Sequence, residues 1–185
     1  MSDTAVRADR RPRRLAAGVL LAGALLTASA PVAHADARPA DVRDKIVEAA
    51  KAEIGTEESG GDNCQKYSEQ CVAWCSLFAT WAWEKAGVDI DNEDYAFTGD
   101  VYTHGQDEDK AYNAKNLDQA QPGDVLLFGS GPESPDTSTH IGVVEKVSGD
   151  EVTLIEGNAG DNTDRVVRRT HTLSAETFYG GVQPW

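Results

Sequence analysis

Residues 71–87, Cys-Val-Ala-Trp-Cys-Ser-Leu-Phe-Ala-Thr-Trp-Ala-Trp-Glu-Lys-Ala-Gly, constrain the fold more than any other part of the sequence. Apolar side chains recur at helical spacing, at Phe78, Ala79, Ala82 and Trp83. This period predicts a buried helix over about residues 72–86, and Gly87 is placed to end it. The other elements must therefore pack around this helix.

Cys75 lies at the front of the same apolar segment. The N-terminus of a helix carries a partial positive charge, which stabilises a thiolate and favours a reactive cysteine. Two alternatives stay open. A free cysteine is often only a small buried apolar side chain. If Ser68 caps the helix instead, Cys75 falls in the second turn, where the charge effect is weaker.

The first 35 residues have the three parts of a secretory signal peptide. A basic segment precedes an apolar core at residues 15–28, and the small residues Ala33 and Ala35 mark a cleavage site before Asp36. We therefore predict a signal peptide at 1–35 and a single domain at 36–185, secreted and either extracellular or associated with the cell wall. Arg13-Arg14 also permits a twin-arginine signal, although general secretion fits better. No second apolar segment approaches 18 residues, so the sequence predicts no membrane anchor.

The predicted domain is strongly acidic. Residues 1–35 hold five arginines and two aspartates, so 12 basic and 29 acidic residues remain, a net charge of −17. Such a chain repels nucleic acids and anionic membranes, which argues against partners of either kind.

The three cysteines lie close together, at 64, 71 and 75. In an oxidising compartment two of them are expected to pair. We predict a Cys64–Cys71 disulfide across a short polar segment, which leaves Cys75 as the odd thiol. The pairs Cys64–Cys75 and Cys71–Cys75 remain alternatives.

The rest of the chain predicts helices first and strands afterwards. Residues 41–54 have an amphipathic helical pattern, and residues 88–121 have no strong period beyond a short helix near 98–104. Strands are predicted at 125–128, 140–146, 152–156, 164–172 and 178–182, with Ser148-Gly149-Asp150 turning one hairpin. This order indicates an α+β domain with an antiparallel sheet.

The hairpin brings three polar residues together. Counting outward from its turn, His140 falls opposite about residue 158, beside Glu156 and Asn158. Glu156 shares a strand face with Val152 and Leu154, and a carboxylate on an apolar face needs a partner. His140 is the natural partner. The other two histidines of the predicted domain, His104 and His171, have no motif around them, so we interpret them as solvated polar residues.

A cysteine, a histidine and a third polar group form a known kind of nucleophilic site. The thiolate attacks a carbonyl carbon, the histidine transfers the proton, and the third group fixes the imidazole tautomer. The alternative is a purely structural His140–Glu156 pair, with Asn158 as an ordinary turn residue.

Four segments together resemble the CHAP family, the cysteine- and histidine-dependent amidohydrolases/peptidases. They are Trp74-Cys-Ser-Leu-Phe-Ala-Thr-Trp81, Pro122-Gly-Asp-Val-Leu-Leu-Phe128, His140-Ile-Gly-Val-Val144 and Ile155-Glu-Gly-Asn158. The resemblance covers about residues 42–160 and implies a papain-like fold, with a helical half packed on an antiparallel sheet.

By matching position, the resemblance implies that Cys75 is the nucleophile, His140 the base and Glu156 the group that orients the imidazole, with Asn158 as a fourth polar member of the site. Gln70-Cys71 also resembles another form of the motif. The aromatic positions and Gly87 fall correctly only when counted from Cys75, which disfavours Cys71.

The resemblance further implies cleavage of an amide bond in bacterial peptidoglycan, by an endopeptidase or an N-acetylmuramoyl-L-alanine amidase, through a thioester. This chemistry needs no metal or cofactor, and we expect a monomer. Gln65 and Gln70 are candidates for a second oxyanion donor. The acidic residues 91–94 are interpreted as solvated because their spacing fits no known calcium loop. Two alternatives remain: a hydrolase of a non-wall peptide, such as a toxin against neighbouring cells, and an inactive secreted peptide-binding module.

Overall fold

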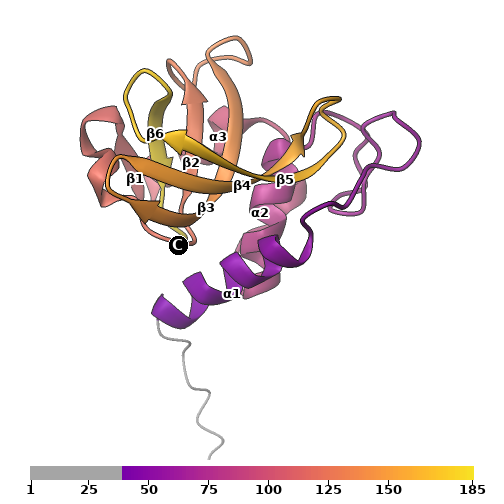
Figure 1. Cartoon of the computed structure of the whole chain (residues 1–185), viewed down its shortest axis with the longest axis horizontal. Coiled ribbons are helices and arrows are strands. Elements are labelled where there is room, and N and C mark those ends of the chain that lie inside the picture. The colour runs from indigo at the N-terminus through magenta and orange to yellow at the C-terminus, as the bar shows by residue number, and fades with distance from the viewer. Residues whose placement is uncertain (1–38) are drawn as a thin grey trace, which may run out of the picture. The chain divides into compact units, whose positions relative to one another are not determined.

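The computed structural model describes residues 39–185, in which helices precede most of the strands (Figure 1). The signal peptide predicted at 1–35 lies outside these residues. The helical elements are α1 (Pro39–Ala52), α2 (Cys75–Ala86) and α3 (Thr98–Asp107), with the short 3₁₀ helices η1 (Asn92–Asp94) and η2 (Ala114–Gln119). None of the described helices is long and apolar enough to cross a membrane.

Six strands form one antiparallel sheet in the order β1-β6-β2-β3-β4-β5. They are β1 (Ala111–Asn113), β2 (Val125–Gly129), β3 (Ser138–Ser148), β4 (Glu151–Ala159), β5 (Arg165–Thr172) and β6 (Phe178–Val182). The predicted α+β class and the five predicted strands are confirmed. The short strand β1 was not predicted.

Helix α2 is the buried centre of the domain, as its sequence predicted. It contacts α1 on one side and β3 and β4 on the other (Figure 1). Trp74, Phe78 and Trp83 are fully buried. The helix ends at Gly87, whose φ of 96° is the left-handed conformation that glycine adopts without strain. The start differs from the prediction, because α2 begins at Cys75 rather than near residue 72.

Gly157 allows α2 to approach β4 closely. A Cβ atom at this position would lie 2.5 Å from the Cβ of Phe78 and 2.7 Å from the Trp74 ring. Such distances are far inside van der Waals contact, so any side chain here would push the helix away from the strand. The motif Glu-Gly-Asn therefore has a packing role in addition to its polar residues.

The sheet has an apolar core on each face. One core joins the sheet to α1 and α2, and its strand residues are Val125, Leu127, Ile141, Val143, Ile155, Val166, Tyr179 and Val182. The other core contains Leu126, Val144, Val152, Leu154 and Phe178, covered by Tyr112 and Leu117. Because side chains alternate along a strand, Glu156 lies on the same face of β4 as Leu154 and Val152.

A buried carboxylate connects α1 to the sheet. Asp124 is fully buried. It accepts hydrogen bonds from the Arg43 guanidinium of α1, from the Tyr112 hydroxyl at 3.1 Å and from the Gln121 N–H at 3.0 Å. Burial raises the pKa of Asp124 above its ordinary value, although the charge of Arg43 and these hydrogen bonds oppose the shift. The motif Pro122-Gly-Asp thus anchors the N-terminal helix.

The disulfide joins Cys64 to Cys71, as predicted, and Cys75 is the free cysteine. Within the disulfide loop, Gln65 donates to the Ser68 hydroxyl and to the Gln70 carbonyl oxygen. The loop precedes α2 directly and therefore fixes the path by which the chain reaches Cys75.

The segment between α2 and β2 is held by tertiary contacts that its sequence does not reveal. In η1, Asn92 is buried and donates to the Tyr67 carbonyl oxygen. The side chain of Asp91 accepts a hydrogen bond from the Glu93 N–H at the start of this helix. Residues 91–94 are therefore only in part the solvated loop that was predicted. The prediction for His104 was also wrong, because its ring packs against Trp185 at 4.5 Å and Tyr95 at 5.7 Å between centroids.

Removing the disulfide is expected to destabilise the domain. Closing a loop of this length lowers the conformational entropy of the unfolded chain. This stabilises the folded state by roughly 2–3 kcal/mol on the chain-entropy estimate. The double variant Cys64→Ser/Cys71→Ser should lose about that much free energy of unfolding in urea denaturation. Single variants are less suitable, because each leaves a second reactive thiol. An unchanged urea concentration at the unfolding midpoint, relative to wild type, would contradict the expectation.

Candidate active site

Cys75 is the first residue of α2 and lies in the first turn after Trp74. The first amide groups of a helix have no partner within the helix and carry the positive end of its dipole. The Trp74 N–H is held by Asn158 Oδ1 at 3.1 Å, which links the start of the helix to β4. Cys75 is 8% exposed, so most of the residue is buried at the start of the helix.

The hairpin β3–β4 places His140 beside Glu156, as the sequence predicted. Val143 pairs with Ile155, and a bulge at Glu145 shifts the register toward the turn. Glu156 is 1% exposed, and its Oε2 lies 3.0 Å from His140 Nε2. The buried carboxylate therefore has the partner that its apolar surroundings require.

The protonation of His140 follows from this contact. Since the Glu156 carboxylate can only accept, Nε2 carries a proton and donates it, which leaves Nδ1 to face Cys75. Burial alone would lower the pKa of His140, but hydrogen bonds with Cys75 and Glu156, and their charges, raise it to about 9. At neutral pH the imidazole is then a cation between a sulfur and a carboxylate.

Glu156 also binds a second histidine that the sequence interpretation treated as solvated. His171 on β5 donates from Nε2 to Glu156 Oε1 at 2.6 Å, and its side chain is 22% exposed. Burial would raise the pKa of Glu156, but hydrogen bonds with His140 and His171 lower it to about 2. The prediction for His171 was therefore wrong.

An aromatic ring supports both histidines. Phe128 at the end of β2 lies 5.2 Å from the His140 ring and 5.1 Å from the His171 ring, between centroids. Alternation along β5 could have indicated that His171 shares the sheet face of Glu156. The pairing of β4 with β5 depends on the irregular turn at residues 160–164, however, and no residue pattern in this turn favours one register over another.

Asn158 serves the backbone rather than the imidazole. Besides accepting from Trp74, it donates from Nδ2 to the Thr163 carbonyl oxygen and, at 3.4 Å, to Asn63 Oδ1. Its φ of 52° is left-handed, a conformation in which asparagine is one of the few suitable side chains. The structure thus brings Asn158 to the site, where it holds the start of α2, and shows no hydrogen bond between it and His140.

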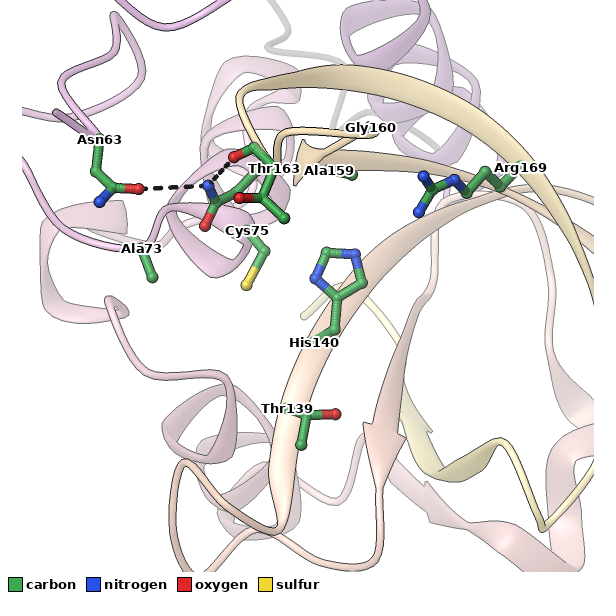
Figure 2. A pocket seen from close by; sticks show the side chains of 10 residues that line it. Asn63, Ala73, Cys75, Thr139, His140, Ala159, Gly160, Thr163 and Arg169 are labelled. Carbon is green, nitrogen blue, oxygen red and sulfur yellow. Dashed lines mark hydrogen bonds between the residues drawn. The ribbon is translucent and has the colours of Figure 1, made fainter. Parts of the chain in front are cut away.

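Cys75 and His140 face each other across a cleft of about 440 Å³ (Figure 2). Asn158, Thr139 and Arg169 also line this cleft. A second hollow of about 310 Å³ adjoins the first and shares Ala73, Cys75 and Thr139 with it. Its lining is mostly apolar and includes Val72, Ala96, Phe97 and Pro135. A substrate chain lying through both parts would pass over the sulfur of Cys75.

The two glutamines considered as oxyanion donors are engaged elsewhere. The amide of Gln65 bonds within the disulfide loop, and that of Gln70 donates to the Glu93 carbonyl oxygen at 2.7 Å and to its carboxylate at 3.0 Å. Neither lines the cleft. The first amide groups of α2, where Cys75 lies, have no partner within the helix and are the remaining candidates for this role. Within residues 39–185, no cluster of three or more histidine, cysteine or acidic side chains could hold a metal ion.

The family model for the CHAP domain matches residues 60–158, which contain Cys75, His140, Glu156 and Asn158. The chain belongs to the CHAP family. The resemblance found in the sequence is thereby confirmed, together with the α+β fold of papain-like type. Membership assigns the chain to a family of amidohydrolases and peptidases, while the role of each residue stays a prediction.

Two solved structures are similar to this CHAP domain. One is the crystal structure of Ly7917, with 17% identity and a TM-score of 0.46. The other is Ly7917 with the hydrolyzing product of MDP, with 16% identity and a TM-score of 0.48. Each match covers 77% of this chain and 62% of the other. Among curated proteins, none matches the sequence significantly.

The paired geometry predicts that Cys75 reacts readily in the folded protein. Iodoacetamide should alkylate it quickly near neutral pH, because its sulfur faces the His140 ring at the start of a helix. His140→Ala should slow the reaction by at least about tenfold. Mass spectrometry of the adduct over time measures the rate, and His104→Ala, outside the cleft, is the matched control. A thiol that reacts only on unfolding would contradict the prediction.

A second prediction concerns His171. His171→Leu leaves Glu156 Oε1 buried without its donor and should lower the free energy of unfolding by about 1–3 kcal/mol. His171→Gln retains an N–H donor and should lose less. The pKa of Glu156 is lowered, so this stabilisation is complete above its ordinary value of 4.5 and is lost as the pH falls through about 2.

The difference between wild type and His171→Leu should therefore be largest above that ordinary value and shrink in stronger acid. Urea denaturation at about pH 7 and about pH 3 measures it. Equal losses for the leucine and glutamine variants would show that His171 acts only by packing.

Proposed function

We propose that this CHAP domain is a secreted cysteine hydrolase that cleaves an amide bond in bacterial peptidoglycan, as an endopeptidase or an N-acetylmuramoyl-L-alanine amidase. The observation that carries the proposal is the alignment of Cys75, His140 and Glu156 at the cleft of a CHAP-family chain. Within this proposal, Cys75 is the nucleophile, His140 is the base, and Glu156 is the carboxylate that orients the imidazole.

In the first half of the reaction, the Cys75 sulfur attacks the amide carbonyl carbon. The carbonyl oxygen becomes an oxyanion, which the free N–H groups at the start of α2 stabilise. His140 then gives its Nδ1 proton to the departing nitrogen. The C–N bond breaks, an amine leaves, and the acyl group remains on Cys75 as a thioester.

In the second half, a water molecule replaces the amine. His140, now neutral, takes a proton from this water as it attacks the thioester carbon. The C–S bond breaks, a carboxylic acid leaves, and the sulfur returns to its paired state with the imidazolium. Throughout, Glu156 holds Nε2–H and stabilises the positive ring, and it remains a carboxylate because its pKa is held at about 2.

Two features support secretion within this proposal. Residues 1–35 have the pattern of a signal peptide. The disulfide Cys64–Cys71 suits an oxidising compartment outside the cytoplasm. A protein that acts outside the cell, or at the wall, fits both features.

The test is mass spectrometry of purified peptidoglycan after incubation with the protein and with its Cys75→Ala variant. We expect new peptide or glycan ends with the wild type only, and their masses name the bond that is cut. Because alanine is smaller than cysteine and apolar, the variant should keep its fold, which circular dichroism can verify.

Two other outcomes would contradict the proposal in different ways. Fast alkylation of Cys75 without release from several wall types would indicate a non-wall peptide substrate. No release together with an inert thiol would indicate a peptide-binding module instead of an enzyme.

A further inference from the structure

Strand β5 carries three arginines, and two of them are neutralised by close partners. Arg165 lies 2.8 Å from Asp164 and 3.0 Å from Glu57. Arg168 makes two parallel hydrogen bonds to Glu145, at 2.6 and 2.9 Å. Paired in this way, neither guanidinium is available to a ligand without first losing its partner.

Arg169 differs from both. Among residues 39–185, its one ion-pair contact is Glu156 Oε2 at 3.9 Å, beyond hydrogen-bond distance. That oxygen already accepts from His140, and the other oxygen accepts from His171. Glu156 therefore does not saturate Arg169, whose side chain is 44% exposed and retains its fork of N–H donors.

The free guanidinium belongs to the catalytic cleft. Arg169 lines the same hollow as Cys75 and His140, and Figure 2 shows its guanidinium directed into it from β5. The other lining residues are neutral asparagine, threonine, alanine and glycine side chains, with no carboxylate among them. In a chain with a net charge of −14, this part of the cleft is a local site of positive charge.

The adjoining hollow differs from this part of the cleft in the residues that line it. Beyond Cys75, the second hollow is lined by Val72, Ala96, Phe97 and Pro135, and Val72 is 43% exposed. This part favours a small apolar group and disfavours a charge, because a charge would lose its hydration there. Cys75 lies where the charged and apolar parts meet.

We infer that Arg169 is a specificity residue that binds a free carboxylate of the substrate close to the amide bond being cut, with an apolar residue on the other side of that bond. This inference rests on the proposed function. Guanidinium and carboxylate groups match in planar two-bond geometry, so a carboxamide in the same place would bind much more weakly. The substrate class is then an anionic peptide.

The test compares two forms of the same wall. Purified peptidoglycan is used as isolated, and after its carboxylates are converted to carboxamides with carbodiimide and ammonium. Wild type should cut the carboxylate form about 10- to 100-fold faster in kcat/KM, the range expected for a charged hydrogen bond. Arg169→Gln should lose this preference. Arg168→Gln, one residue away and on the opposite strand face, should retain it.

If Arg169 acted only through its contact with Glu156, the rates would change in a different way. Arg169→Gln would then slow both wall forms equally and would also slow alkylation of Cys75 by neutral iodoacetamide. We expect that alkylation rate to stay unchanged, and an equal slowing of both walls would overturn the inference. Equal cutting of both walls by wild type would overturn it as well, while the proposed function would stand.

If no wall is cut, the proposed function fails and Arg169 is tested on Cys75 directly. The ratio of alkylation rates with iodoacetate and iodoacetamide compares an anionic with a neutral reagent of similar size. Arg169→Gln should lower this ratio several-fold relative to wild type and Arg168→Gln. An unchanged ratio would reject Arg169 as a carboxylate-binding group.

Discussion

The close packing of α2 against β4 is the constraint on which the rest of the structure depends. Only a glycine at 157 leaves room for Phe78 and Trp74 at their observed distances. Asn158, the next residue, holds the Trp74 N–H, so the helix is fixed both by contact and by a directed hydrogen bond. Together these two residues set where α2 begins. The start of the helix in turn decides how far the Cys75 sulfur lies from the imidazole on β3.

The second essential feature is a buried carboxylate, that of Glu156, whose two oxygens both accept hydrogen bonds. Glu156 would be costly inside an apolar face, yet each of its oxygens receives a hydrogen bond, one from His140 and one from His171. Phe128 packs against both rings. The imidazole that faces Cys75 is thus restrained at its far nitrogen and along its side, which leaves little freedom for a second orientation. Polar groups held by such restraints need no reorganisation when charge develops beside them.

Local geometry made part of the site predictable. A hairpin with a short turn fixes register, so His140 and Glu156 could be paired from sequence alone, and helical spacing located the helix that carries Cys75. The rest depends on contacts between distant segments. His171 reaches Glu156 only because of how β5 aligns beyond an irregular turn, and Asn158 bonds to a backbone group 84 positions away. Strand β1 and the 3₁₀ helices are too short to leave a periodic pattern, and packing rather than propensity stabilises them.

The anchoring of Asp124 sets how small an excised version of this domain could be. The family match spans residues 60–158, and cutting there would remove Arg43 from one end and His171 from the other. Asp124 would lose its cation, Glu156 would lose one of its two donors, and β2 would lose its neighbour β6. The autonomous folding unit is therefore wider than the recognisable motif. A fusion or transplantation that grafts only the motif would carry the reactive groups without the framework that keeps them aligned.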